Sequence, residues 1–568
     1  MHQRGFKSSI IIIFISLIAM NCILFPEVIF SQGTDSVNKR ALTFRGNISL
    51  NMVGYAVGGI PSRAEPFSAV LSANVTINLY DIEIPLILIL SDKQKSYAQP
   101  FNQFGISPRW KWITIHAGYR NIAFSNYTLA GKTFLGGGIE LNPSLFRFGF
   151  VYGRFNRSTN ESQVYENDYQ PQYKNAGFAV KLGVGNEKNF FDLILLRIKD
   201  DSNSAKQPDT GLIRTPVQNL VSGFNSRFTF FKRLVLEAEF AVSLYTANLG
   251  APAISDVEDD AFLRTINKFT VINQSSEYYS AGRASLQYKS ELFSCKLEYK
   301  RIDPNYRSLG AYFLNNDLEN LTLSPTFGLF KRKLYISGSI GLQRDNLRAT
   351  KRATSIRTIG NVSVSMNPSS RFGIDANYGN YSISQQSGRM PLSDTTKVHQ
   401  ANQNFSVLPR LFLFNTKRNH LIMLIYTLTN FIDKNKFTSD YTHYTAQTAQ
   451  FNYTLGLIQK GWSITTGLTY ISSKTYLSDA RNFGVTAGVS KSLVCNKISL
   501  NWNNSLMLSE SQQDRSWIFN SNVFAVYQVN AHHNLRLNIY FNGDYYDPGS
   551  VNPSFNEIKG DMTYAYTF

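Results

Sequence analysis

The chain lacks the features that a disulfide scaffold or a helical membrane protein requires. It has 3 cysteines in 568 residues, and Cys295 and Cys495 lie far apart in sequence, which excludes a disulfide framework. Beyond residue 24 there is no apolar run long enough to cross a membrane as a helix. Amphipathic segments of helical period are missing too, so an ordinary multidomain soluble protein is disfavoured.

What the chain has instead is aromatic residues and alternation. It contains 31 Tyr, 41 Phe and 37 Gly. From Arg45 onward, segments of roughly ten to fifteen residues alternate between apolar and polar side chains. One of the clearest has Leu234, Leu236, Ala238, Phe240, Val242 and Leu244 on one parity and Glu237, Glu239 and Ser243 on the other. Successive strand residues point to opposite faces, so such segments predict strands with one apolar and one wet face.

The connections between these segments alternate in length. Short ones lie at 142–144, 231–233, 289–291, 330–333 and 367–371, and they interleave with long polar ones at 200–215, 248–275, 303–318, 344–353 and 386–401. Short turns at one rim and long loops at the other are typical of membrane-spanning β-barrels.

The N-terminal residues have the pattern of an export signal. Arg4 and Lys7 precede an apolar run at residues 10–24, and Ser31 offers a small residue before Gln32. We therefore interpret residues 1–31 as a signal peptide that is removed on export. A single membrane-anchoring helix remains the alternative.

The final residues, NEIKGDMTYAYTF, form an alternating strand that stops at an aromatic side chain. Ile558, Met562, Tyr564, Tyr566 and Phe568 share one parity. The segment resembles the closing strand of Gram-negative outer-membrane β-barrel proteins. The resemblance implies that Tyr564, Tyr566 and Phe568 belong to the signal read by the barrel insertion machinery. It also implies that the protein lies in the outer membrane, with membrane lipid as a partner.

The predicted fold is all-β, a large antiparallel up-and-down barrel of about 26 strands (24 to 26) at residues 45–568. Residues 32–44 would form a short periplasmic segment, too short for an internal plug domain. Both termini and the short turns would be periplasmic, and the long loops extracellular. A soluble sandwich or propeller is the alternative fold.

The charge is strongly basic, at +18, but it is dispersed rather than clustered, so nucleic-acid binding is not expected. Parity places six basic residues on the inward face, opposed by Glu237, Glu239, Glu298 and Asp561. The six are Arg227, Arg283, Lys296, Lys300, Arg536 and Lys559. They would either favour anions in the lumen or pair with the acids, and both interpretations stay open.

Few other residues suggest chemistry. Asp256, Glu258, Asp259 and Asp260 form an acidic loop cluster that is a weak candidate for metal binding, since it lacks EF-hand spacing. His399 with Asp394 and Ser393, and His443 with Asp440 and Ser439, match no hydrolase motif. We therefore expect no enzymatic activity and no cofactor.

A barrel of this size would leave a wide lumen, which must be filled. The first candidates are the loop segments at 127–141 and 248–275, or a separate plug protein. The favoured function is a solute pore constricted by inward loops, with anion preference as one of the two open interpretations of its basic residues. The alternatives are a partner-plugged component of a secretion, assembly or export system, and a surface-binding, adhesin-like barrel.

Overall fold

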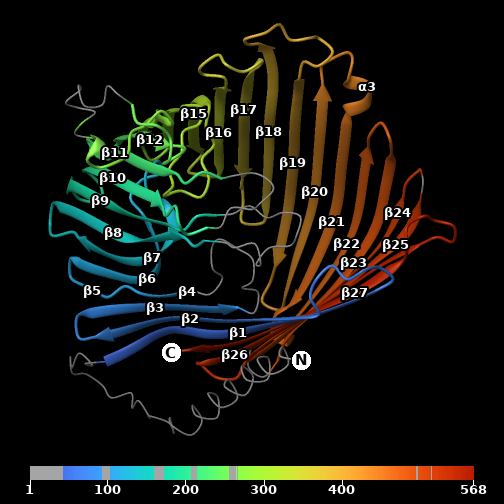
Figure 1. The fold of residues 1–568 in the computed structure, drawn as a ribbon. Helices are drawn as coiled ribbons and strands as arrows, with labels where there is room; N and C mark the ends of the chain where they lie inside the picture. Colours follow the sequence, from blue (N-terminus) through green and yellow to red (C-terminus); the bar gives the residue numbers. More distant parts are fainter. Residues whose placement is uncertain are drawn as a thin grey trace. The chain divides into compact units, whose positions relative to one another are not determined.

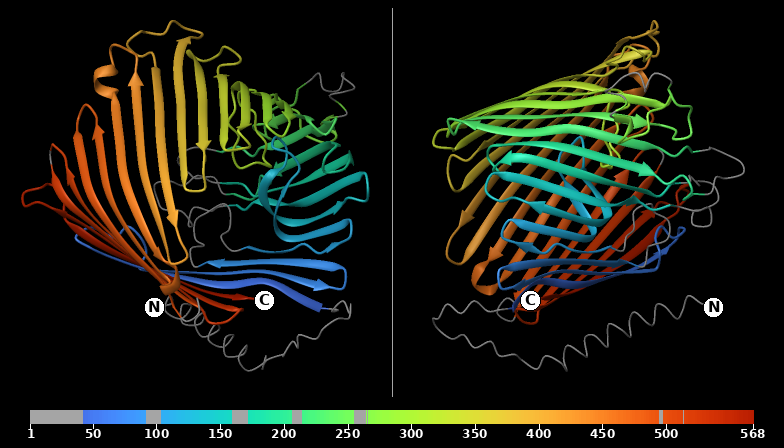
Figure 2. Two further views of the ribbon diagram at one scale, coloured as in Figure 1. Left: turned by 180° about the vertical axis from the view of Figure 1, so that it is seen from behind. Right: turned by 60° about the vertical axis from the view of Figure 1, so that its left-hand side comes forward.

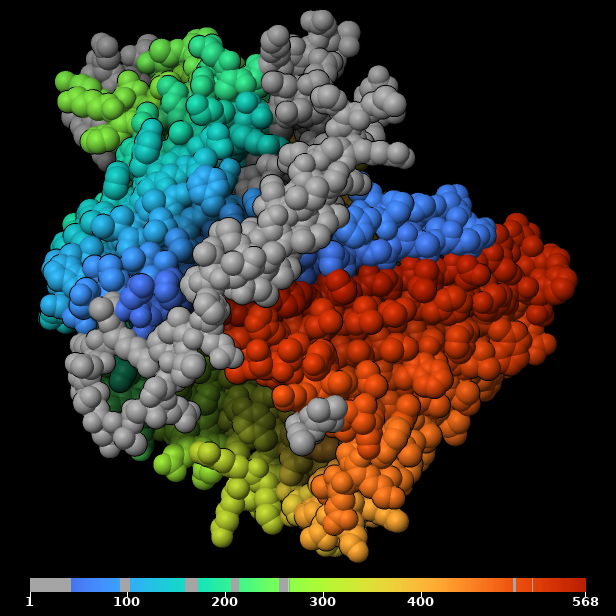
Figure 3. All heavy atoms as spheres, turned by 90° about the horizontal axis from the view of Figure 1, so that it is seen from below, coloured from blue at the N-terminus to red at the C-terminus, as the bar shows by residue number. Residues whose placement is uncertain are grey.

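The protein is a closed antiparallel β-barrel, seen in a computed structural model (Figure 1). The structure describes residues 42–91, 103–158, 172–205, 214–254, 264, 266–493, 497–512 and 514–568. The barrel is one compact unit, Thr43–Phe568. It closes where the first strand pairs antiparallel with the last, from Asn47 opposite Thr567 to Gly58 opposite Asn556. In Figure 3 these two strands lie side by side, blue against red.

The strands follow one another in chain order around the wall. The first thirteen are β1 (Leu42–Gly58), β2 (Phe67–Leu79), β3 (Ile82–Ser91), β4 (Gln103–Ile106), β5 (Arg109–Trp110), β6 (Ile113–Ala123), β7 (Ala130–Leu141), β8 (Phe146–Asn156), β9 (Asn175–Gly185), β10 (Phe190–Asp200), β11 (Gln218–Phe230), β12 (Leu234–Thr246) and β13 (Ser276–Lys289). The next seven are β14 (Phe293–Ile302), β15 (Leu318–Leu329), β16 (Leu334–Arg344), β17 (Ala353–Met366), β18 (Phe372–Ser387), β19 (His399–Phe414) and β20 (Arg418–Asp433). The last are β21 (Tyr444–Leu457), β22 (Trp462–Lys474), β23 (Asp479–Leu493), β24 (Ile498–Glu510), β25 (Arg515–Gln528), β26 (His533–Tyr546) and β27 (Phe555–Thr567). A helical turn α3 (Ser439–Thr442) follows β20, and a 3-10 turn η3 (Ile458–Lys460) follows β21.

The predicted count of 26 strands is confirmed, because β4 and β5 are two parts of one strand. Both pair with β3 and with β6, and the register continues from one to the other without a shift. Pro108 lies in the break between them. Pro325 in β15 and Pro409 in β19 likewise fall where pairing with the following strand is interrupted. Proline has no N–H to donate to a ladder, which explains all three interruptions.

The predicted alternation of short turns and long loops is confirmed over the described strands. The turns at 231–233, 330–333 and 367–371 join β11 to β12, β15 to β16 and β17 to β18. Residues 303–317 and 388–398 are long connections at the opposite rim. In a 26-strand barrel, β8 and β21 lie half a circumference apart, so they belong to facing walls (Figure 2).

A row of glycines crosses five neighbouring strands of the barrel wall. Each is the cross-strand partner of the next: Gly105, Gly118, Gly136, Gly153 and Gly177. A Cβ on Gly136 would lie 2.1 Å from the carbonyl oxygen of Tyr152. Only glycine therefore allows this close approach of strands β4 to β9.

Among the described residues, no helix is long and apolar enough to cross a membrane.

Candidate functional site: the barrel lumen

The two faces of the wall differ in polarity as the sequence alternation predicts. On β12, Leu236, Phe240 and Val242 are exposed on the outer face. Glu239 and Ala241, on the other parity, are 3% and 0% exposed. A residue buried on the inner face of a barrel must be covered by something inside the lumen.

Two inward-folded connections cover this part of the wall, and we call them the loop pair: residues 124–129, between β6 and β7, and residues 303–317, between β14 and β15. Tyr306 donates its hydroxyl hydrogen to the carbonyl of Tyr127 at 2.6 Å, and Ser308 donates to the carbonyl of Thr128 at 2.5 Å. The backbone N–H of Ala130 donates to the carbonyl of Gly310 at 3.0 Å. The two connections therefore form one hydrogen-bonded body.

The wall holds the loop pair through buried polar side chains. The hydroxyl of Ser243 donates to the carbonyl of Arg307 at 2.6 Å, and the side chain of Asn219 accepts from the N–H of Leu309 at 2.9 Å. The Glu239 carboxylate accepts from the backbone N–H and from the side-chain amide of Asn126. Each loop is thus fixed to β11 or β12 as well as to its partner.

An apolar core lies between the loop pair and the wall. Leu129, Phe134, Leu196, Ile302 and Tyr306 are among its fully buried members. The rings of Tyr127 and Tyr306 meet edge to face at 6.3 Å between centroids. Burial, with a smaller contribution from the Glu239 charge, raises the pKa of Tyr306, so its hydroxyl remains a donor at neutral pH.

Asp317, the last residue of the connection 303–317, is held by the neighbouring connection between β16 and β17. Its carboxylate accepts from the backbone N–H of Leu347 at 2.9 Å and lies against the ammonium of Lys351. Burial raises the pKa of Asp317, but the hydrogen bonds from Lys351, Leu347 and Asn346 outweigh it, so the net pKa is lowered. The ionised carboxylate therefore ties residues 303–317 to residues 345–352.

The prediction of the segments that fill the lumen, 127–141 and 248–275, is confirmed only in part. Within 127–141, the first residues belong to the loop pair, but Ala130–Leu141 is the wall strand β7. In the described part of 248–275, Thr270 and Asn273 are buried, and Thr270 accepts from the Gln218 side chain at 2.7 Å. Residues 303–317 were not identified as an inward loop. The apolar residues Leu309 and Ala311 in a supposedly external loop were the available signal.

Three of the six basic residues expected in the lumen form ion pairs. Arg227 lies 3.6 Å from Glu237, and Lys296 lies 2.5 Å from Glu298. Arg283 lies 3.9 Å from both Glu239 and Glu298. These three residues therefore belong to a network of ion pairs on β11 to β14, beside the loop pair.

The other three have no such partner among the described residues. Lys300 is the cross-strand partner of Arg283, and Arg536 donates to the side chain of Asn534 at 3.1 Å. Lys559 is the cross-strand partner of Tyr540. No carboxylate of the described residues lies within 4.0 Å of Lys300, Arg536 or Lys559.

The wall opposite the loop pair has a different chemistry. On the described parts of β21 to β25, every inward position is uncharged. Its amides are Gln450, Asn452, Asn482, Asn501, Asn503, Asn520, Asn522 and Gln528. Several hydrogen-bond to one another or to a neighbour, as Asn503 does to Asn501 at 2.6 Å and Asn522 to Asn538 at 2.7 Å. We call this surface the amide wall.

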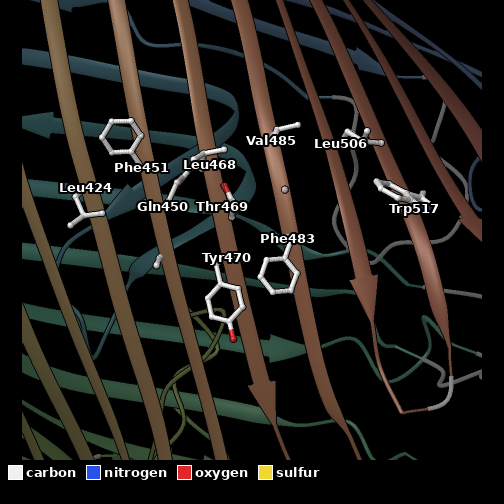
Figure 4. Close-up of a pocket in the computed structure, with 12 residues that line it drawn as sticks. Leu424, Gln450, Phe451, Leu468, Thr469, Tyr470, Phe483, Val485, Leu506 and Trp517 are labelled. Atoms are coloured by element: carbon white, nitrogen blue, oxygen red, sulfur yellow. The ribbon is translucent and has the colours of Figure 1, made fainter.

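The outer face of the same strands is apolar and slightly hollowed. A concavity of about 560 Å³ lies on it, bordered by Leu424, Phe451, Leu468, Phe483 and Trp517 (Figure 4). These residues share the parity opposite to the amides. Trp462 and Tyr470 lie on the same outward parity as Leu468.

The C-terminal aromatics lie together at the seam. The N–H of Phe568 donates to the carbonyl of Gly46 at 2.9 Å, and its ring lies 6.1 Å from that of Phe44 and 5.0 Å from that of Tyr566. Tyr564 shares a 2.7 Å hydrogen bond with the ring of His533. β1 begins at Leu42, so the first strand takes up the end of the segment 32–44.

Two of the remaining sequence candidates lie outside the described residues. Asp256, Glu258, Asp259 and Asp260 lie outside the described residues. Within the part of the chain that the structure describes, no group of His, Cys, Asp and Glu has metal-binding geometry. The residues of the signal-peptide interpretation, 1–31, also lie outside that part.

No known protein family and no curated protein matches the chain. Among solved structures, the copper transporter OprC is similar at 8% identity and a TM-score of 0.39, covering 92% of this chain and 80% of that one. The FrpB iron transporter from Neisseria meningitidis is similar at 9% identity and 0.36, over 92% and 81%. OccAB2 from Acinetobacter baumannii is similar at 9% identity and 0.30, over 62% and 92%.

Proposed function

We propose that the protein spans a bacterial outer membrane and forms a transport pore that its own loop pair narrows from one side. The observation that carries the proposal is the separation of polarity across a closed wall. Leu468 is 60% exposed on the outer face, while the inward positions beside it carry amides and hydroxyls. An apolar outer band of this extent is stable in lipid, and a polar interior is stable with water.

We infer that the loop pair narrows the lumen without sealing it. The loop pair covers part of the inward face of β8 to β11, where Val151, Leu196 and Val221 are fully buried. On the facing wall, Tyr381 and Tyr540 point inward and are 43% and 37% exposed. An accessible inner wall supports a water-filled passage beside the loop pair.

We further propose that the pore prefers anions and that Arg536 and Lys559 cause this preference. Both are exposed and lie on the inward parity of β26 and β27. Arg283 and Lys296 are ion-paired beside the loop pair, so they contribute little to the field along the passage. Asp561 shares the face of Lys559, which keeps the expected preference modest.

Single-channel recording in planar bilayers tests the proposal. We expect the purified barrel to open defined channels with a modest anion preference. Arg536→Glu with Lys559→Glu should reverse that preference, and Arg283→Glu should leave it nearly unchanged. A correctly folded barrel that stays electrically silent would refute the pore and favour a barrel plugged by a partner protein.

A further inference from the structure

Among the described residues, the accessible inward side chains lie on one side of the barrel. Side chains that point inward from β8 to β11, such as Val151, Leu196 and Val221, have no exposed surface. Side chains that point inward from β18, β25 and β26 are accessible, with Tyr381 43%, Phe524 36% and Tyr540 37% exposed. A solute that crosses the barrel therefore moves along the wall of β17 to β27, away from the loop pair.

That wall includes five consecutive strands without an inward charge. From β21 to β25 the inward side chains are amides, hydroxyls, glycines and a few apolar residues. Inward charges lie elsewhere: on the facing wall Arg147 pairs with Asp192 and Lys181 with Glu140, and on β26 and β27 Arg536 and Lys559 flank the uncharged strands. A surface without charge gives neither cations nor anions an electrostatic advantage.

The amides offer hydrogen-bonding of both kinds. Each Asn side chain carries two N–H donors and an accepting oxygen. Asn503 and Asn522 are cross-strand partners, and Tyr540 is the partner of Asn522 on the next strand. Tyr540 donates its hydroxyl hydrogen to Asn520 at 2.9 Å, which fixes its ring beside the amides.

This combination suits one class of solute. A hydroxyl group both donates and accepts a hydrogen bond, as an amide does. A sugar ring adds an apolar C–H face, and Phe524 and Tyr540 offer accessible aromatic surface next to Asn522. A small inorganic ion, by contrast, would find no counter-charge on β21 to β25 to replace its hydration.

We propose that the amide wall is the solute path of the pore and that it binds uncharged, hydroxyl-rich solutes of the sugar type as they pass. The inference rests on the proposed pore function and adds its route and solute class. Contact is made by Asn503 and Asn522 through hydrogen bonds, with the rings of Phe524 and Tyr540 beneath the solute.

The test is current block by an uncharged trisaccharide, maltotriose, in single-channel recordings of the full barrel. Maltotriose should interrupt the ion current in a saturable manner. The double variant Asn503→Ala with Asn522→Ala should raise the half-saturating maltotriose concentration about fivefold, which is the effect of losing about one net hydrogen bond. The matched control, Asn315→Ala, changes an exposed amide on residues 303–317 and should leave the block unchanged.

A second measurement, the reversal potential, tests the solute path without a sugar. Asn503→Lys should shift the reversal potential toward anion selectivity, and Asn315→Lys should not. Channels that conduct ions but show no maltotriose block, or a block that the double variant leaves intact, overturn the amide-wall inference while the pore stands. A silent barrel overturns the pore, and the inference with it.

Discussion

Tyr306 joins the two connections of the loop pair, so under the proposed function it should control how far the lumen is narrowed. Its side chain is 1% exposed, and its hydroxyl donates to the carbonyl of Tyr127 across the loop pair at 2.6 Å. Tyr306→Phe removes that hydrogen bond and leaves a buried carbonyl unpaired, a cost of about 1 kcal/mol or somewhat more. Tyr306→Ala also leaves a cavity, and truncation of a buried aromatic costs about 3–5 kcal/mol.

These costs act on the equilibrium between a docked and an undocked loop pair. About 1.4 kcal/mol corresponds to a factor of ten. The undocked population should therefore rise five- to tenfold in Tyr306→Phe and more than a hundredfold in Tyr306→Ala. Because burial raises the pKa of Tyr306, the wild-type hydroxyl keeps its proton, and docking should not weaken between pH 7 and pH 9.

Single-channel recording measures the effect as openings to a conductance level above the wild-type level. Phe313→Ala is the matched control, since Phe313 lies on the same connection and is 80% exposed. Heat-modifiable migration on a gel verifies that each barrel is folded. If Tyr306→Ala folds and shows the conductance and gating of the wild type, the loop pair does not narrow the passage and the reasoning fails.

Three further predictions concern stability and insertion. The folded pKa of Asp317 lies below the unfolded value of about 3.9, so the carboxylate stabilises the docked loop pair fully above that pH, and this stabilisation is lost as the pH falls through the folded pKa. Openings to the higher conductance level should therefore become more frequent below about pH 4 in the wild type. Asp317→Asn should show these openings already at neutral pH. Gly153→Val places a Cβ 2.7 Å from the Leu135 carbonyl and should lower the temperature at which the barrel loses its heat-modifiable form, whereas Gly379→Ala, with no atom within 4 Å, should not. Removal of Phe568 deletes its bond to the first strand, and outer-membrane yield measured by fractionation should drop; an unchanged yield would remove it from the insertion signal.

The barrel wall could be predicted from sequence because its rules are local. The alternation of Leu236 and Phe240 with Glu237 and Glu239 predicts a strand and its two faces, and the pairings of β12 agree. Strand number and sidedness follow by counting such segments. A proline such as Pro409 interrupts one ladder without ending the strand, so the count survives it.

What the sequence could not show is which inward residues meet one another. Parity places Arg283 and Arg536 on the same face, yet Arg283 is paired with two carboxylates and Arg536 is exposed. The contact between Tyr127 and Tyr306 joins segments that no local pattern relates. Periodicity gives the direction of a side chain, and burial inside the lumen depends on loops that periodicity does not describe.

The loop pair has a consequence for the order in which the barrel assembles. Its two connections belong to β6–β7 and to β14–β15, so we expect the strands from β6 to β15 to pair before Tyr306 docks on Tyr127. From that moment the partial barrel contains a buried core, as a soluble domain does. In the part of the chain that the structure describes, the strands from β16 onward have no comparable apolar core, so their order rests chiefly on strand pairing. Folding should therefore proceed in two stages. The strands from β6 to β15 first form a part that its buried core stabilises, and the strands from β16 to β27 then pair onto it one after another until β27 pairs with β1.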